Sequence, residues 1–119
     1  MDGRYDRCAA LVLGAGLSGE AAAKLLLSHG GSVLLMDERA DRADSTCAEN
    51  VRQAGGRVLC GQAEPPRGGF DICVTSPAFP ARHPWIMTCS ERGVPVISEL
   101  ELGAAYWRGR ILAVTGSKG

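Results

Sequence analysis

The clearest pattern in the chain is a series of short apolar runs separated by polar or amphipathic segments. The first two runs, residues 9–13 and 33–36, enclose an alanine- and leucine-rich segment whose apolar positions recur at helical spacing over 17–28. This order predicts a strand, a helix and a second strand that ends on Asp37. Repeated alternation of strands and helices is typical of a parallel sheet with right-handed crossovers.

The same alternation continues along the rest of the chain. Strands are expected at 57–60, 70–75 and 94–97, and helices at 45–54 and 84–92. Glycine and proline are frequent in 61–69, which predicts a loop. Within the polar stretch 40–46, no element is predicted before the helix that starts at residue 45. We therefore predict an α/β fold with a Rossmann-like, open, mostly parallel five-stranded sheet and helices on both faces.

The turn after the first strand has the pattern of a phosphate-binding turn. Gly14 lets the chain turn sharply, Gly16 removes a Cβ that would keep a phosphate away, and Gly19 lets the helix approach the sheet. The N–H groups that begin the helix, with the helix dipole behind them, form an anion site suited to a diphosphate. Asp37, 18 residues after Gly19, is placed to accept hydrogen bonds from a ribose or a base. The alternative is a turn that only packs a helix onto a sheet.

A second turn, residues 76–80, follows the fourth strand. Ligands of open α/β sheets gather beyond the carboxyl ends of the strands where strand order reverses, so this turn should lie beside the glycine turn. Ser76 and the N–H groups of Ala78 and Phe79 could then reach a phosphate or a sugar. The alternative is a loop that its prolines make rigid.

The composition excludes several classes of function. The 119 residues suffice for one domain, and 13 basic and 13 acidic residues give no net charge, so neither nucleic acid nor an acidic membrane is an expected partner. The apolar runs are too short to span a bilayer and the first residues lack a signal-peptide core, which predicts a cytoplasmic protein. Five cysteines without a CxxC pair predict neither a metal site nor a disulfide scaffold. Three of them lie in or beside apolar runs and are expected to be core residues rather than reactive thiols.

The last part of the chain leads toward a second phosphate-binding loop. Ser98 and Glu101 have the spacing of a capping box for a helix that runs to about Trp107. The apolar run 111–114 is followed by a threonine-glycine turn. A strand before a phosphate-binding loop of the pattern G-x-x-x-x-G-K-[ST] ends in the same way, but the lysine and the hydroxyl residue that complete this pattern are absent from the sequence. The candidates for this incomplete ATP-binding loop are Thr115, Gly116, Ser117, Lys118 and Gly119.

Together these features resemble the Mur ligases, and among them most closely the D-glutamate-adding enzymes. The resemblance covers nearly the whole chain and rests on segments in this order: VLGAGLSGEAAAKLL, the triplet at 37–39, SP followed by HP, GVPVISELEL and ILAVTGSKG. It implies an N-terminal UDP-binding Rossmann-like domain over 1–98. Residues 99–119 would then begin the central ATPase domain, cut within the ATP-binding loop.

The resemblance also implies a reaction for the intact enzyme. ATP, with Mg²⁺, would phosphorylate the carboxylate of UDP-N-acetylmuramoyl-L-alanine, and the amine of D-glutamate would then form the amide. This is a step of peptidoglycan biosynthesis and so of cell-wall biogenesis, cell shape and cell division. The groups that this chemistry needs lie outside these residues. We therefore expect no catalytic residue here, and the chain alone is predicted to be inactive as a ligase.

Family knowledge can be carried over to the matching positions. The resemblance implies that the turn at Leu17 and Ser18 meets the diphosphate, that Asp37 accepts a hydrogen bond from the uracil imide, and that the next two residues border the uracil. The turn at 76–78 would border the uridine or its phosphates. The implied UDP-substrate-binding residues are Gly14, Gly16, Leu17, Ser18, Gly19, Asp37, Glu38, Arg39, Ser76, Pro77 and Ala78. The family usually has glycine in place of Ala78, and often a small hydroxyl residue in place of Glu38.

Two other functions remain open at this point. The glycine turn and Asp37 would also suit the NAD-binding domain of an oxidoreductase, and the second acid, Glu38, would disfavour the 2′-phosphate of NADP. The approach to an ATP loop at the C-terminus is unnecessary in such a domain. The third possibility is a non-catalytic nucleotide-sensing or interaction module.

The predicted boundary near Ser98 has a consequence for the helix that follows it. The apolar side chains of this helix would lack their central-domain partners, so they should either fold back onto the sheet or stay exposed. Residues 99–119 are therefore expected to be the segment least protected from amide exchange.

Overall fold

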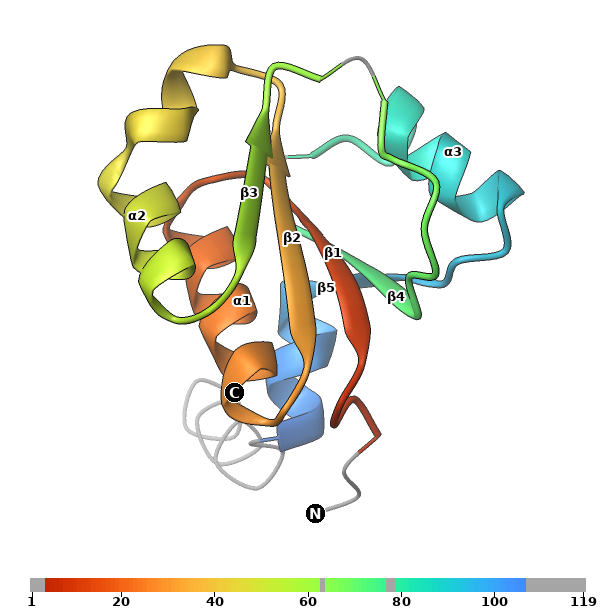
Figure 1. The fold of residues 1–119 in the computed structure, drawn as a ribbon. Helices are drawn as coiled ribbons and strands as arrows, with labels where there is room; N and C mark the ends of the chain where they lie inside the picture. Colours follow the sequence, from red (N-terminus) through yellow and green to blue (C-terminus); the bar gives the residue numbers. More distant parts are fainter. Residues whose placement is uncertain (1–3, 63, 77–78, 107–119) are drawn as a thin grey trace, which may run out of the picture.

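Five parallel strands form one open sheet in the computed structural model, which describes residues 4–62, 64–76 and 79–106 (Figure 1). The order in the sheet is β3-β2-β1-β4-β5, so strand order reverses between β1 and β4. The strands are β1 (Ala9–Leu13), β2 (Ser32–Asp37), β3 (Arg57–Cys60), β4 (Ile72–Thr75) and β5 (Val96–Ser98). The predicted α/β, Rossmann-like fold is confirmed.

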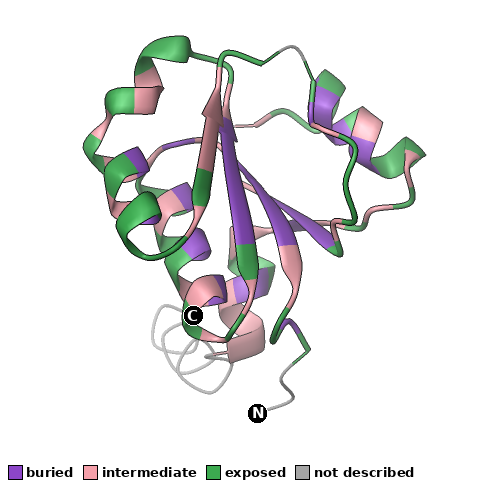
Figure 2. Ribbon diagram, in the orientation of Figure 1, coloured by how far each residue is buried: buried purple, intermediate pink, exposed green. Residues whose placement is uncertain are grey.

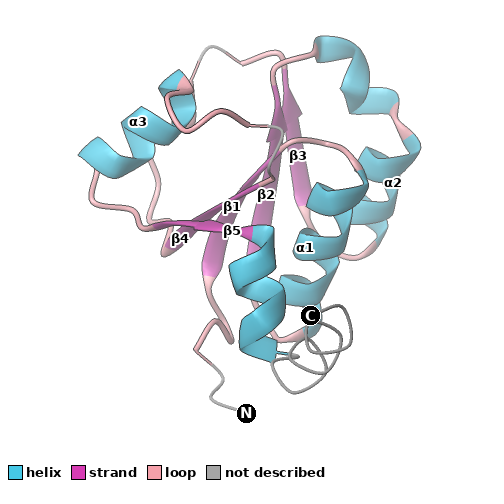
Figure 3. Cartoon of the chain, turned by 180° about the vertical axis from the view of Figure 1, so that it is seen from behind, coloured by secondary structure: helices cyan, strands magenta, loops and turns pink. Residues whose placement is uncertain are grey.

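Helices cover both faces of this sheet. Figure 3 shows α1 (Leu17–Ser28), α2 (Thr46–Gln53) and the helical segment 99–106 on one face, with α3 (Pro84–Glu91) on the other. This arrangement follows from the strands, because successive side chains of a buried strand point to opposite faces of the sheet. Alternate strand residues, such as Val12 and Leu35, pack in the cluster that contains α1, and their neighbours, such as Leu11, pack in the cluster that contains α3. The central strands β1, β2 and β4 are consequently buried from both sides, whereas the edge strands β3 and β5 are mostly intermediate (Figure 2).

Most predicted boundaries are correct, and two differences have a local cause. The predicted strand at 94–97 is Val96–Ser98 in the structure, because the N–H of Val94 donates to Cys89 O at 2.9 Å and so completes the C-terminal turn of α3. The fourth strand was expected from residue 70 and begins at Ile72, because the N–H of Phe70 donates to Gly68 O at 3.0 Å in a turn.

The first part of the polar stretch, residues 40–44, for which the sequence predicts no element, forms a short 3-10 helix. This helix, η1 (Ala40–Asp44), is closed by hydrogen bonds from Arg42 N to Arg39 O and from Ser45 N to Arg42 O, both 3.0 Å. The side chain of Ser45 then caps α2 by accepting a hydrogen bond from Ala48 N at 3.1 Å. A continuous path from the end of β2 to α2 is therefore fixed by local hydrogen bonds.

The helical segment 99–106 folds back onto the sheet. Its predicted capping box is present, since Ser98 N donates to Glu101 Oε1 at 3.1 Å and Glu101 N donates to Ser98 Oγ at 3.0 Å. Leu102 is 1% exposed within the α1 cluster, whereas Leu100 is 72% exposed. Of the two outcomes expected for the apolar side chains, burial applies to Leu102 and exposure to Leu100.

The end of this segment also contacts the N-terminal lead-in. Tyr106 OH donates to Asp6 Oδ1 at 2.8 Å, and its ring stacks on His29 with the centroids 4.2 Å apart. The rest of the predicted helix and the ATP-loop residues, 107 and 115–119, lie outside the described residues. None of the helices in the described part of the chain has the length and apolarity that crossing a bilayer requires.

Candidate functional site

The glycine turn between β1 and α1 is built on two glycines that the fold itself requires. Gly14 has a φ of +105°, and its N–H donates to Met36 O at 2.7 Å, which joins the turn to the end of β2. A Cβ at Gly19 would lie 1.9 Å from the carbonyl oxygen of Gly14. Because that oxygen belongs to the backbone, no side-chain movement can make room for the Cβ.

Gly16 differs from these two because the fold makes no demand on it. A Cβ built on this residue meets no atom within 4 Å, and its φ of −110° is open to any residue. Gly16 is the N-cap of α1, and no side-chain hydrogen bond caps the helix there. The space beside the first N–H groups of α1 is therefore empty of protein atoms.

This space belongs to a cavity of about 350 Å³ at the point where strand order reverses. The prediction that the turn after β4 lies beside the glycine turn is confirmed, because Ser76 lines the same cavity. The described residues around it are Gly14, Ala15, Gly16, Leu17, Ser18, Gly19, Asp37, Arg42, Ser76 and Phe79. The sheet thus brings together residues more than 60 positions apart in the sequence.

The carboxylate of Asp37 is fixed at the edge of this cavity. Its Oδ2 accepts a hydrogen bond from Ala15 N at 2.8 Å, and its Oδ1 accepts one from Arg39 N at 2.9 Å. Each carboxylate oxygen can accept a second hydrogen bond. Asp37 therefore supports the glycine turn while retaining capacity to accept from a ligand.

No family model matches the chain, but curated proteins do. UDP-N-acetylmuramoylalanine–D-glutamate ligase of Geobacillus kaustophilus is 33% identical over 97% of this chain. The enzymes of the same name from Chlorobium luteolum and Frankia casuarinae are each 40% identical, over 91% and 92% of this chain. The chain belongs to the Mur ligase family. It spans about a quarter of the length of these relatives, with 26%, 23% and 23% of each covered.

Two of the positions implied by the Mur ligase resemblance, Glu38 and Arg39, are not among the residues that line the cavity. Arg39 forms an ion pair with Asp41, with Nη2 2.8 Å from Oδ2 and Nε 3.2 Å from Oδ1. The hydrogen bond to Asp41 raises the pKa of Arg39, and the same bond lowers the pKa of Asp41. Both residues follow Asp37 directly, and each lies close to a protein partner.

The partner of Glu38 is a buried histidine. His83 is 9% exposed, and its Nε2 lies 3.0 Å from Glu38 Oε1, although no hydrogen bond of good geometry forms. Its Nδ1 accepts a hydrogen bond from Trp85 N at 3.1 Å and so caps α3. Because Nδ1 accepts, the neutral ring carries its proton on Nε2, toward Glu38. The HP pair of this chain thus places α3 next to the residue that follows β2.

Three residues of the cavity were not predicted as site residues from the sequence: Ala15, which lies within the glycine turn, Arg42 and Phe79. The ring of Phe79, whose N–H alone was considered, lies 3.3 Å from a Cβ built on Gly14 and contacts the His83 ring at a tilt of 48°, with the centroids 4.7 Å apart. Arg42 lies in η1, and its Nη1 donates to Ala15 O at 3.2 Å. No periodic or motif signal marks the side chain of Arg42 or Phe79, because a 3-10 turn and a loop bring them to the cavity.

Two predicted residues of the Mur ligase site, Pro77 and Ala78, lie outside the described residues. Their neighbours Ser76 and Phe79 both line the cavity. The described part of the chain contains no group of three or more His, Cys, Asp or Glu side chains that could hold a metal ion.

Proposed function

We propose that this chain binds the UDP part of UDP-N-acetylmuramoyl-L-alanine for a ligase that adds D-glutamate. The observation that carries this proposal is the empty space at Gly16, beside the N-terminus of α1 and within the cavity at the switch point. A diphosphate there would accept hydrogen bonds from the N–H groups of the turn. The names of the relatives support the choice of ligand, since they refer to UDP-N-acetylmuramoylalanine and D-glutamate.

In this proposal Asp37 accepts the imide N–H of uracil, and Leu17 and Ser18 meet the diphosphate. The two hydrogen bonds from Ala15 N and Arg39 N to the Asp37 carboxylate support this role, because they hold it at the rim of the cavity. Glu38 and Arg39 would border the base, and the turn at 76–78 the uridine or its phosphates. The alternative of an NAD-binding oxidoreductase domain has no support from the relatives reported above.

The remainder of the reaction is proposed for the longer protein. Residues 1–98 would form the UDP-binding domain, and residues 99–119 would begin the central domain, where ATP and Mg²⁺ supply the phosphoryl transfer. The groups that complete the ATP-binding loop and hold Mg²⁺ would come from the remainder of that protein. We propose a cytoplasmic enzyme of peptidoglycan synthesis, and an inactive chain when these 119 residues stand alone.

A parallel titration tests the proposal. The chain would be followed by amide NMR while UDP-N-acetylmuramoyl-L-alanine, UDP and NAD are added separately. Shifts at residues 14–19 and at Asp37 with both uridine ligands but not with NAD are the expected result. Shifts with NAD alone would favour the oxidoreductase domain. If none of the three ligands changes the amide shifts, the proposal that this chain binds the ligand is wrong. Ligase turnover by the isolated chain would contradict its predicted inactivity.

A further inference from the structure

We infer that Arg42 is a binding residue for the diphosphate at the glycine turn. This inference rests on the proposed function and adds a cationic side chain to a site otherwise built of backbone N–H groups and a carboxylate. Arg42 lies 23 residues after Gly19 and outside every motif found in the sequence. Its place at the cavity is a product of η1, which the sequence does not predict.

The geometry of Arg42 aims its guanidinium at the glycine turn. Nη1 donates a hydrogen bond to the carbonyl oxygen of Ala15 at 3.2 Å, and the side chain is partly buried against the turn. Ala15 lies directly before Gly16, where the cavity is open. A guanidinium has five N–H donors in a fixed fork, so one bond to Ala15 orients the group and leaves other donors for an anion.

The guanidinium of Arg42 is not held in an ion pair by a carboxylate of the described residues. Among the residues that the structure describes, no ion pair involves Arg42, whereas Arg39, three positions earlier, is held by both oxygens of Asp41. Asp37 is the one carboxylate among the described residues that line the cavity, and it accepts its hydrogen bonds from Ala15 N and Arg39 N rather than from Arg42. Arg42 is thus the cation at the cavity that is available to an anion.

A diphosphate fits this charge better than a base or a sugar does. Planar guanidinium groups bind phosphate oxygens through two parallel hydrogen bonds, and such charged bonds are about twice as strong as neutral ones. The backbone N–H groups at the start of α1 supply only partial charges. Arg42 would therefore supply a full positive charge, which replaces part of the stabilisation by water that a diphosphate loses when it enters the site.

The test compares ligands that differ only in their phosphates. UDP, UMP and uridine would be titrated by calorimetry into the whole chain and into Arg42→Gln and Arg42→Met. Glutamine keeps a donor for the Ala15 carbonyl and loses the charge, so it remains informative if Met disturbs the turn. Arg57→Met is the matched control, because Arg57 is an exposed arginine at the amino end of β3, away from the carboxyl-end cavity.

We expect the Arg42 variants to bind UDP roughly 10- to 100-fold more weakly, the range for a lost charged hydrogen bond. Uridine affinity should change less than about threefold, and the control should bind all three ligands like the parent chain. Equal losses for UDP and uridine, or no loss for UDP, would overturn the role of Arg42. If the parent chain itself fails to bind UDP, the proposed function fails, which is a separate result.

Discussion

Gly19 and Gly14 are in such close contact that a single added carbon would drive them apart: a Cβ on Gly19 would lie 1.9 Å from the Gly14 carbonyl oxygen. Since α1 begins two residues before Gly19, this contact sets how closely the helix approaches β1. The contact is between backbones, and it gives the third glycine of the turn a purely structural role.

The substitution Gly19→Ala should therefore destabilise the fold even without ligand. We expect a loss of roughly 3 kcal/mol in the free energy of unfolding, the upper range for overpacking a rigid site. Urea denaturation followed by circular dichroism would measure it. A denaturation midpoint equal to that of the parent chain would show that the helix can shift without cost.

The substitution Gly16→Ala is the matched counterpart, and it should separate binding from folding. Its Cβ would meet no protein atom within 4 Å, so the free energy of unfolding should change by less than about 0.5 kcal/mol. The added carbon would occupy the space assigned to the diphosphate and weaken UDP binding by about tenfold or more. Unchanged UDP affinity in a folded Gly16→Ala chain would argue that the ligand lies elsewhere.

His83 gives a prediction about the coupling between α3 and β2. His83→Ala removes the side-chain cap on Trp85 N, and such losses typically cost about 1 kcal/mol. His83→Asn restores a capping acceptor but is too short to approach Glu38, so it should recover most of that stability. Thermal denaturation of the two variants would decide between them. If both lose the same amount, contact with Glu38 and Phe79 rather than capping explains the burial of His83.

Leu102 gives a prediction about the helical segment 99–106. Because its side chain is 1% exposed, Leu102→Ala should cost roughly 2–5 kcal/mol through lost burial and a new cavity. Leu100→Ala, at a site that is 72% exposed, should change stability by less than about 0.5 kcal/mol. Hydrogen exchange would locate the effect and also refine the expectation for 99–119, since the amides near Leu102 should exchange slowly. Fast exchange there would mean that the segment does not remain docked.

Four of the five cysteines should react slowly with alkylating reagents at neutral pH. Burial is the main cause that raises the pKa of Cys8, Cys47 and Cys60, whereas for Cys73 the largest cause is its hydrogen bond with Cys89, followed by burial. The same hydrogen bond lowers the pKa of Cys89 to about 7, so Cys89 is outside this prediction. A raised pKa lowers the thiolate fraction at pH 7, so labelling should accelerate as the pH rises above 9. Mass spectrometry after timed iodoacetamide treatment would measure this. If any of these four cysteines reacts faster at pH 7 than free cysteine does, the prediction is wrong.

The sequence predicts those features that depend on periodicity or on glycine. The positions of β1, α1 and β3, the role of Gly19 and the meeting of Ser76 with the glycine turn all follow from local pattern and from the geometry of parallel sheets. Side-chain contacts between separate elements could not be predicted in this way. The pairing of His83 with Glu38 depends on how α3 settles on the sheet, which no pattern within either segment encodes.

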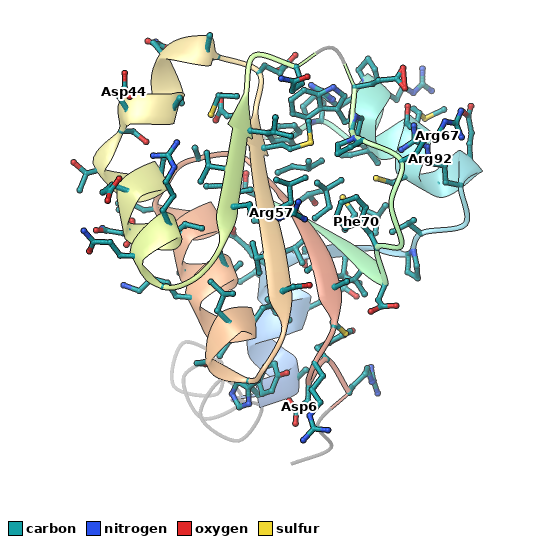
Figure 4. The ribbon with its side chains drawn as sticks, viewed as in Figure 1. Asp6, Asp44, Arg57, Arg67, Phe70 and Arg92 are labelled. Atoms are coloured by element: carbon teal, nitrogen blue, oxygen red, sulfur yellow. The ribbon has the colours of Figure 1, made fainter. Side chains whose placement is uncertain are left out.

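The position of Arg42 could not be predicted for a related reason. The 3-10 helix η1 is only five residues long, with no buried residue and no periodic apolar face to mark it. Figure 4 shows Asp44 at the end of η1, at the opposite end of the molecule from Asp6. The sequence of such a polar segment predicts a loop. Only the folded structure shows that η1 places the Arg42 guanidinium beside the glycine turn.

The hydrogen bond between Asp6 and Tyr106 also bears on how the chain could be rearranged. These residues are 100 positions apart in the sequence, yet their side chains are 2.8 Å apart, beside His29 at the end of α1. A short glycine-rich linker could therefore connect Tyr106 directly to Asp6, and new termini could open in the loop between β3 and β4. Such a circular permutant would keep every strand pairing of the sheet. The order in which the strands leave the ribosome is thus separable from the architecture they build.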